Sequence, residues 1–364
     1  MRSVYIHIPF CNSICSYCDF CKIFYNSKYI DSYLDNLELE IKARYQNDKI
    51  KTIYLGGGTP SSLSLDELKK LFSILKIFNL SDNYEFTMEC NLDVSLDKIR
   101  LMKDNGVNRV SLGVQSFDPD NLKILERTHT KKDVFEKVEL FKRNGIDNIN
   151  IDLIYGVNDN ISILKKDLNY FLKLDIPHIS CYSLIIEDHT KLGVNKREYI
   201  SEDIDYKMYK LIEDTLTKNN YIHYEISNYS KAGYSSKHNL TYWNNSEYYG
   251  FGLSSVEYID NIRRSNTKNL EKYLSGKYLE NTILENEEIQ MENEMILGLR
   301  KLSGVSEKVF FSKYHKKIED VFDIIELLRD NKVILENDFL RINKNYLYLS
   351  NEILINFIKE EENG

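Results

Sequence analysis

Four cysteines stand close together in Cys11-Asn-Ser-Ile-Cys15-Ser-Tyr-Cys18-Asp-Phe-Cys21, directly after the apolar run at residues 4–10. The apolar run predicts a strand, so the cysteines belong to the loop that follows it. Seven residues extend by at most about 23–25 Å, and a loop this short must curl to bring the thiolates of Cys11, Cys15 and Cys18 together. Such a group of thiolates suits an iron–sulfur cluster. Three ligands leave one iron of a 4Fe–4S cube free to bind another molecule.

Other readings of the same cysteines are a zinc knuckle, a redox-active thiol pair and buried structural thiols. A structural zinc site usually has a second ligand pair a dozen or more residues downstream, and the sequence has neither Cys-x-x-Cys nor His-x-x-His there. The cluster is favoured because the spacing occurs together with a preceding strand and with the further motifs described below.

The composition points to a globular protein with a substantial core. The chain has 364 residues, of which 42% are hydrophobic, so one large domain and a smaller one are expected. Its net charge is −8, from 48 basic and 56 acidic residues, which argues against a nucleic-acid-binding protein.

The cysteines and the N-terminus bear on the cellular compartment. Six cysteines, four of them in one loop, do not form the pattern of a disulfide framework. Met-Arg-Ser leads straight into the first predicted strand, which leaves no room for a signal peptide, and no run of 18 apolar residues predicts a membrane span. We therefore expect a cytoplasmic protein, in a reducing compartment that suits an oxygen-sensitive cluster.

Strands and helices are predicted to alternate along the first 220 residues. The predicted strands lie at 4–8, 52–55, 84–89, 109–114, 148–155 and 178–184, and the helices at 29–44, from about 64, 96–105, 132–144, 163–173 and 204–218. Ser64 is a predicted N-cap, with Glu67 three residues later. Six such units predict a parallel sheet that falls short of the eight units of a closed barrel. Functional side chains should therefore gather at the carboxyl ends of the strands.

The pattern changes after residue 250. Residues 266–280 are polar and predict a connection, and residues 287–302 predict a helix with Met291, Met295 and Leu299 on one stripe. Helix-turn-helix spacing follows, with short predicted strands at 333–335, 340–342 and 346–349. This part is interpreted as a small winged-helix-like domain, and the acidic composition argues against DNA binding.

A glycine turn, Gly56-Gly57-Gly58-Thr59-Pro60, comes directly after the second predicted strand. Consecutive glycines allow the backbone to approach a ligand closely and to present N–H and C=O groups to it. The turn lacks the Lys-Ser/Thr of a phosphate-binding loop, and taken alone it is also compatible with an ordinary tight turn.

Polar side chains stand at or beyond three later strands. Glu89 ends the third, Gln115 and Arg127 follow the fourth, and Asp152 lies inside the apolar fifth. A carboxylate in an apolar strand is costly to bury unless a partner compensates it. Asp152 therefore indicates either a ligand site or a salt bridge to a neighbouring side chain.

The run His238-Asn239-Leu-Thr-Tyr242-Trp243 holds the chain's single tryptophan. Histidine is a common axial ligand of heme iron, and flanking aromatic rings can stack on a macrocycle. A lone histidine is also often a hydrogen-bonded structural residue.

The cysteine loop within Tyr5-Ile-His-Ile-Pro-Phe-Cys11-x-x-x-Cys15-x-Tyr-Cys18-Asp-Phe closely resembles that of radical S-adenosylmethionine (SAM) proteins. Within them it resembles the group that contains oxygen-independent coproporphyrinogen III oxidases and heme chaperones, over nearly the whole chain. The resemblance implies an α/β fold with a partial (β/α)6 barrel. It also implies a 4Fe–4S cluster whose open iron is chelated by SAM, and reduction of the cluster that cleaves SAM to a 5′-deoxyadenosyl radical.

The resemblance divides the chain into a radical SAM domain at 1–250, which includes the histidine–tryptophan run, a connection at 251–285 and a winged-helix-like domain at 286–364. It implies that Cys11, Cys15 and Cys18 hold the cluster and that Arg127 and Asp152 meet the carboxylate and the ribose hydroxyls of SAM. The implied cofactor contacts are completed by Tyr5, Gly56, Gly57, Gly58, Thr59, Glu89 and Gln115.

The histidine–tryptophan run resembles the heme chaperone branch, in which His238 is the candidate heme ligand. The oxidases have Cys-x-Cys where Phe20 stands here, which leaves Cys21 as a reserve cluster ligand or without a role. Leu253-Ser-Ser255 replaces a glycine-rich segment that ends in histidine near the expected porphyrin site. The missing Cys-x-Cys, the short N-terminus ahead of Tyr5 and the histidine–tryptophan run favour a heme chaperone over a coproporphyrinogen III oxidase or a radical enzyme acting on another molecule. The implied partners are heme, a heme-accepting protein and an electron donor such as flavodoxin or ferredoxin.

The spacing predicts which cysteines hold the cluster. Anaerobically reconstituted protein should contain about four irons and four sulfides per chain. Changing Cys11, Cys15 or Cys18 to alanine should abolish the cluster, whereas Cys21→Ala should retain it. Iron and sulfide analysis checks this, and a Cys21→Ala protein as empty as Cys15→Ala would show that the ligand assignment is wrong.

Overall fold

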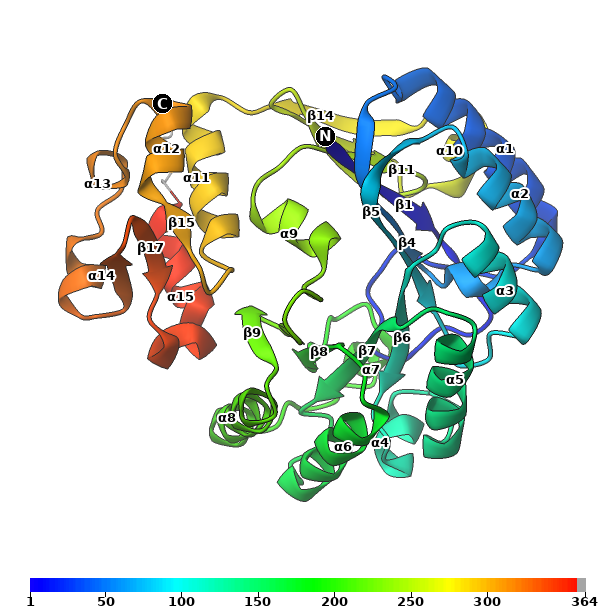
Figure 1. Cartoon of the computed structure of the whole chain (residues 1–364), viewed down its shortest axis with the longest axis horizontal. Coiled ribbons are helices and arrows are strands. Elements are labelled where there is room, and N and C mark those ends of the chain that lie inside the picture. The colour runs from blue at the N-terminus through cyan, green and yellow to red at the C-terminus, as the bar shows by residue number, and fades with distance from the viewer. Residues whose placement is uncertain (359–364) are drawn as a thin grey trace.

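Six parallel strands form the centre of the computed structural model, which describes residues 1–358. Their spatial order follows the chain: β1 (Arg2–Ile8), β4 (Lys49–Gly57), β5 (Asn79–Cys90), β6 (Arg109–Gln115), β7 (Asn148–Tyr155) and β8 (His178–Ser183). These are the six strands that the sequence predicts. The sheet curves, and the helices that alternate with its strands lie along its outer side (Figure 1).

The outer helices begin and end close to the predicted positions. They are α1 (Ser27–Arg44), α2 (Leu65–Leu75), α3 (Leu96–Asp104), α5 (Lys131–Arg143), α6 (Ile161–Leu174) and α8 (Glu202–Lys218), with the shorter α4 (Pro119–Ile124) and α7 (Lys191–Val194). Helix α2 has the predicted cap: the Ser64 side chain accepts from the Glu67 N–H, and the Glu67 carboxylate accepts from the Ser64 N–H at 2.6 Å. This reciprocal pair satisfies two N–H groups that have no partner inside the helix.

The sheet continues beyond the six strands at both edges. On the β1 side it adds β11 (Tyr248–Phe251), which runs parallel to β1, and then the antiparallel strands β12 (Val256–Ile259), β13 (Ile262–Asn266) and β14 (Leu279–Leu284). On the β8 side it adds β10 (Asn228–Ser230) and β9 (Ile222–Glu225). Two short helices lie between these strands, α9 (Lys237–Trp243) and α10 (Leu270–Leu274).

The strands β12 to β14 correct the expectation of a connection at 251–285. They carry ion pairs in place of an apolar run: Arg263 pairs with Glu285 at 2.7 Å, and Arg264 pairs with Glu257 at 2.9 Å. All of β14 is exposed. Alternating apolar residues are the sequence signal of a strand, and this extension lacks that signal.

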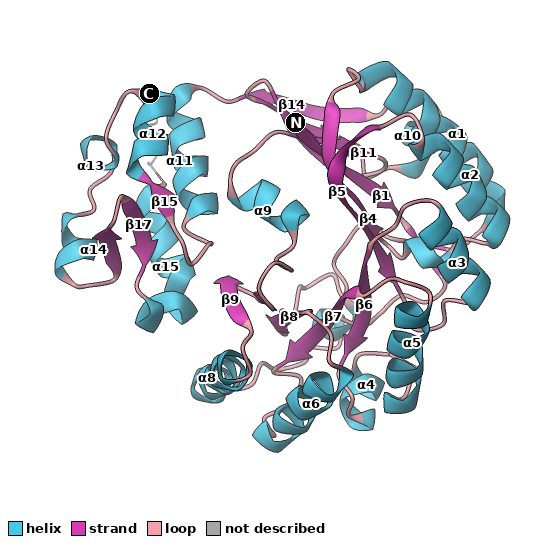
Figure 2. Cartoon of the chain, in the orientation of Figure 1, coloured by secondary structure: helices cyan, strands magenta, loops and turns pink. Residues whose placement is uncertain are grey.

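The C-terminal part has its own small core and sheet (Figure 2). Its elements are α11 (Glu287–Gly298), β15 (Val305–Ser306), α12 (Glu307–Tyr314), α13 (Ile318–Val321), α14 (Ile325–Arg329), β16 (Val333–Glu336), β17 (Phe339–Ile342) and α15 (Ser350–Leu354). The strands pair in the order β15-β17-β16, and Met291, Met295 and Leu299 are buried in the core as predicted.

One element of this part differs from its prediction. The strand expected at 346–349 is a 3₁₀ helix, Lys344–Leu349, whose N-cap Asn343 accepts from the Asn345 N–H. A capping asparagine starts a helical turn in the same short apolar segment that could have formed a strand. The predicted domain runs to residue 364, and its residues 359–364 lie outside the described ones. The domain boundaries at 250 and 285 stay a prediction.

Candidate functional site

A cavity of about 420 Å³ opens where the parallel strands end. Most of the residues that the sequence singled out line it: Cys11, Cys15, Cys18, Gly57, Gly58, Thr59, Glu89, Gln115, Arg127 and Asp152. They come from the cysteine loop, from the ends of β4 to β7 and from the segment after α4. Tyr5, Gly56 and His238 do not line this cavity, which is called the first cavity below.

The cysteine loop is closed at its base by two short parallel strands, β2 (Phe10–Cys11) and β3 (Ile23–Phe24). The Cys18 N–H donates to the Cys15 carbonyl at 3.3 Å, which makes the curl that the spacing requires. Cys11, Cys15 and Cys18 are free thiols, and burial raises the pKa of Cys11 to about 11. That thiol therefore needs a positive charge nearby, such as that of a metal, to become a thiolate near neutral pH.

The glycine turn packs against the start of the cysteine loop. The Gly58 N–H donates to the Ile8 carbonyl, and the Thr59 N–H donates to the Phe10 carbonyl, both at 2.9 Å. A Cβ atom at Gly58 would lie 2.5 Å from the Pro9 carbonyl carbon, so only glycine permits this approach. Thr59 then places its hydroxyl 3.7 Å from the Cys11 sulfur.

Gly57 and Gly56 are required for different reasons. Gly57 has a φ of +112°, and a Cβ there would lie 2.6 Å from the ring of His7. Gly56 faces Tyr54 and Glu89, whose atoms lie within 3.0 Å of the Cβ it lacks. Gly56 thus makes room for the wall of the first cavity without lining it.

Two half-buried carboxylates, Glu89 and Asp152, face the first cavity. Glu89 accepts from the Tyr54 hydroxyl at 2.9 Å and from the Gly57 N–H at 3.2 Å, and burial raises its pKa to about 7. Asp152 accepts from the Ser111 hydroxyl at 3.1 Å and from the Asn150 amide at 2.9 Å, and burial raises its pKa. Asp152 has neutral hydrogen-bond partners, so the alternative of a salt bridge to a neighbour is not what the structure shows.

Gln115 and Arg127 complete the polar wall. Gln115 is 8% exposed, and its Oε1 has no hydrogen-bond partner among the described residues. A buried acceptor without a partner costs about 1–3 kcal/mol unless a ligand supplies the donor. Arg127 donates to the Cys15 sulfur at 3.4 Å, to the Asn91 side chain at 3.0 Å and to the Gly113 carbonyl. Its guanidinium thus ties the cysteine loop to the ends of two strands.

Several lining residues were not found from the sequence, among them Tyr54, Asn91, Ser111 and Tyr182. Tyr54 lies two residues before Gly56 on β4, and Asn91 directly follows β5. Their positions near the carboxyl ends of predicted strands were the one available signal. Their residue types are common on any protein surface and do not indicate a ligand site.

His238 is buried on the inner side of the curved sheet, with 1% of its surface exposed and its ring 5.0 Å from that of Tyr54. Its Nδ1 is hydrogen-bonded to the Thr52 hydroxyl at 2.7 Å and its Nε2 to the Tyr242 hydroxyl at 2.8 Å. Its backbone N–H donates to Glu85 at 3.0 Å. An iron could reach this ring only after one of the side-chain hydrogen bonds had broken. The axial-ligand role of His238 stays a prediction, and this arrangement does not favour it.

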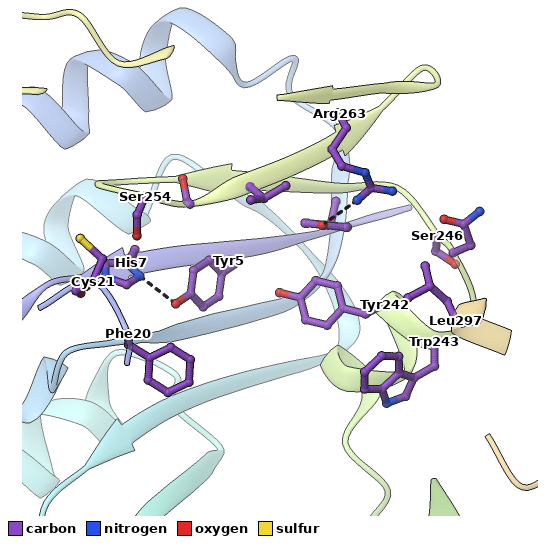
Figure 3. A pocket seen from close by; sticks show the side chains of 14 residues that line it. Tyr5, His7, Phe20, Cys21, Tyr242, Trp243, Ser246, Ser254, Arg263 and Leu297 are labelled. Atoms are coloured by element: carbon purple, nitrogen blue, oxygen red, sulfur yellow. Dashed lines mark hydrogen bonds between the residues drawn. The ribbon is translucent and has the colours of Figure 1, made fainter. Parts of the chain in front are cut away.

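A second cavity, of about 410 Å³, is lined by residues of β1, the cysteine loop, α9 and β11 (Figure 3). Tyr5, which was expected among the SAM contacts, lines this cavity together with Cys21, Tyr242 and Trp243. Ser254 and Ser255, from the segment that departs from the expected glycine-rich pattern, also line it. Phe20 lines both cavities.

Comparison with known proteins gives the family. The Radical SAM superfamily model matches residues 5–166. The heme chaperone HemW of Lactococcus lactis is 41% identical over 355 residues, which cover 94% of this chain and 92% of that protein. The Bacillus subtilis HemW is 39% identical, covering 97% and 96%. The chain belongs to the HemW family of radical SAM proteins.

The solved structure of HemN from Escherichia coli, a coproporphyrinogen III oxidase, matches the chain with a TM-score of 0.86 and 20% sequence identity. The match covers 98% of this chain and 89% of that structure. This likeness shows the fold alone and confirms the radical SAM α/β architecture. No helix in residues 1–358 is long and apolar enough to cross a membrane.

Family membership implies a 4Fe–4S cluster and SAM, and the first cavity fits both. Cys11, Cys15 and Cys18 line it with free thiols, and the glycine turn lets the backbone approach a ligand. Gln115 offers a buried acceptor that no protein group uses. The cavity's volume is within the range of about 300–1,000 Å³ that small-molecule sites occupy.

The burial of His238 predicts a pH dependence of stability. Burial lowers its pKa to about 3, so the folded state keeps the ring neutral, whereas the unfolded chain binds a proton below a pH of about 6.5. The contribution of the neutral ring is complete above pH 6.5 and is lost progressively as the pH falls toward 3. Between pH 6 and 4, the unfolding free energy of the wild type should therefore fall more steeply than that of His238→Gln, by up to about 1.4 kcal/mol per pH unit.

Urea unfolding at several pH values measures this difference. His189→Gln, at an exposed histidine, is the control and should parallel the wild type. Equal slopes for the wild type and His238→Gln would show that His238 is not held neutral in the folded protein.

Proposed function

We propose that the protein binds heme and transfers it to an acceptor protein, while carrying a 4Fe–4S cluster and SAM in the first cavity. The observation that carries this proposal is the match to two heme chaperones at 41% and 39% identity over 94% and 97% of the chain. The two matches leave only 6% and 3% of the chain uncovered.

The cofactor roles follow the chemistry of the cavity wall. Cys11, Cys15 and Cys18 would hold the cluster, which when bound and reduced would supply the electron that cleaves SAM. Arg127 is the one guanidinium that lines the first cavity in the described chain, which suits the SAM carboxylate. Asp152 is a half-buried acceptor that lines the cavity and suits the ribose hydroxyls.

The glycine turn and two further side chains complete the proposed SAM pocket. The SAM amino group would meet backbone groups of Gly57, Gly58 and Thr59. The Gly57 N–H donates a hydrogen bond to Glu89, which fixes the turn. Gln115 presents its free carbonyl oxygen to a donor on the ligand. Tyr5 and Gly56, which do not line this cavity, support it only through the residues beside them.

The oxidase activity has weaker support. The likeness to the oxidase structure has 20% identity and concerns the fold. Phe20 stands where the oxidases have the last cysteine of Cys-x-Cys, and Cys21 lines the second cavity instead of the first. Reduction of the cluster would require an electron donor such as flavodoxin or ferredoxin. A cytoplasmic location suits the free thiols of this chain.

The role of Asp152 can be separated from its contribution to the fold. Asp152→Ala should weaken SAM binding by about tenfold to a hundredfold, because a hydrogen bond to a charged group is worth about 1.5–3 kcal/mol. Calorimetry on the reconstituted protein measures the affinity. Asp167→Asn is a matched control: Asp167 is 3% exposed and accepts from the Ser116 hydroxyl at 2.6 Å, but it does not line the first cavity.

Asp167→Asn should lower the melting temperature and leave SAM affinity unchanged. Should Asp152→Ala instead keep wild-type affinity while its melting temperature drops, Asp152 would be a structural residue.

The chaperone and oxidase functions predict opposite results in two assays. Heme added to anaerobically reconstituted protein should give a Soret band that saturates at about one heme per chain. Coproporphyrinogen III, incubated with the same protein, SAM and reductant, should remain unconsumed. A protein that binds no heme and decarboxylates coproporphyrinogen III would overturn the proposed function.

A further inference from the structure

A row of buried polar side chains crosses three neighbouring strands next to the first cavity. Ser111 of β6, Asn150 of β7 and His178 of β8 are register partners, and each is at most 3% exposed. In closed parallel barrels, branched apolar residues mostly fill the inward positions of the strands. Polar side chains in such positions are costly to bury unless their hydrogen bonds are satisfied. The bonds of this row are satisfied, and they lead to Asp152.

The amide of Asn150 holds the Asp152 carboxylate. Its Nδ2 donates to Asp152 at 2.9 Å and to the Ser111 hydroxyl at 2.7 Å. The Ser111 hydroxyl donates to the other oxygen of Asp152 at 3.1 Å. Asn150 lines neither cavity, whereas Asp152 lines the first. The direction in which the carboxylate faces therefore depends on the orientation of one buried amide.

His178 sets the orientation of that amide. Because both hydrogens of the Asn150 Nδ2 go to oxygen acceptors, its Oδ1 accepts, from the His178 Nδ1 at 2.6 Å and from the Ser180 hydroxyl at 3.3 Å. The His178 Nδ1 therefore carries a proton. Burial lowers the pKa of His178 well below its usual range, and the charge of Arg109 lowers it further, so the ring is neutral. Its Nε2 is then an acceptor.

Tyr224 fixes the other side of the ring. Its hydroxyl donates to the His178 Nε2 at 2.8 Å and accepts from the Ser236 N–H at 3.2 Å. Ser236 is the N-cap of α9, which lies in the concavity of the curved sheet (Figure 1). One chain of hydrogen bonds, with every donor pointing the same way, thus runs from the start of α9 through His178 to Asp152.

We propose that His178 is a positioning residue for the ribose of SAM, which it serves by orienting Asp152 through Asn150. The inference rests on the proposed function and deepens it, because it adds to the cofactor site a residue that lines neither cavity. Without the His178 proton, the Asn150 amide would be free to turn and present its oxygen to the Asp152 carboxylate, which would repel it. Aligned hydrogen bonds in a buried interior strengthen one another and keep a single orientation.

The test measures SAM affinity by calorimetry on reconstituted wild type, His178→Phe, Tyr224→Phe and Tyr221→Phe. Tyr221 is the matched control, because its buried hydroxyl also donates one hydrogen bond, to the Ile176 carbonyl at 2.6 Å, and it lines neither cavity. His178→Phe should weaken SAM affinity by about tenfold and Tyr224→Phe by about threefold, since each removes neutral hydrogen bonds from the chain. Tyr221→Phe should lower the melting temperature and leave SAM affinity unchanged.

A second measurement repeats His178→Phe in an Asp152→Ala background. A residue that acts through Asp152 has nothing left to position there, so the added substitution should weaken SAM binding no further. An equal loss in both backgrounds would show that His178 acts through the general fold, and the inference would be wrong. Tyr224→Phe keeps its ring and gives the same test, in the same background, should His178→Phe fail to fold.

The outcomes separate this inference from the proposed function. If Asp152→Ala weakens SAM binding but His178→Phe and Tyr224→Phe keep the wild-type affinity, His178 has no positioning role and the proposed SAM pocket stands. If Asp152→Ala itself keeps the wild-type affinity, the proposed pocket fails and the inference fails with it. Equal weakening by Tyr221→Phe and Tyr224→Phe would show a general effect of stability and would also overturn the inference.

Discussion

The contact between the glycine turn and the base of the cysteine loop holds the first cavity together. Two backbone hydrogen bonds, from Gly58 to Ile8 and from Thr59 to Phe10, fix the end of β4 beneath the loop. The approach is so close that a Cβ atom at Gly58 would overlap the Pro9 carbonyl. Two motifs that are far apart in the sequence therefore form one structural unit, and the position of the Cys11 thiol depends on it.

The two carboxylates of the first cavity, Glu89 and Asp152, are stabilised by hydrogen bonds from neutral groups. Glu89 and Asp152 both lie in parallel strands, where an unpaired charge would be costly, and each accepts two hydrogen bonds from neutral groups. Gln115 differs, because its oxygen has no partner among the described residues. The cavity thus holds two carboxylates oriented by their hydrogen bonds and one amide oxygen without a donor. This arrangement suits a charged, hydroxyl-rich ligand better than a structural core.

The sequence predicted the parts of the fold that rest on local patterns. The six parallel strands carry apolar runs and the helices carry caps such as Ser64, so both were found close to their real ends. The strands β12 to β14 were missed because charged residues such as Arg263 and Arg264 in β13, and polar residues in β14, interrupt the apolar pattern. Residues such as Tyr54 and Arg263 gain their roles from distant parts of the chain, and a single sequence does not show such contacts.

The histidine of the histidine–tryptophan run makes structural hydrogen bonds that the motif alone does not reveal. His238 bonds Thr52 with one nitrogen and Tyr242 with the other, so it fixes the ring that its own helix presents to the second cavity. Cys21 is positioned by a different constraint, because it lies two residues before β3, and β3 pairs with β2 at the base of the loop. The Cys21 carbonyl is hydrogen-bonded to His7 of β1 at 2.7 Å, so the same loop lines the first cavity with Cys11, Cys15 and Cys18 and the second with Cys21.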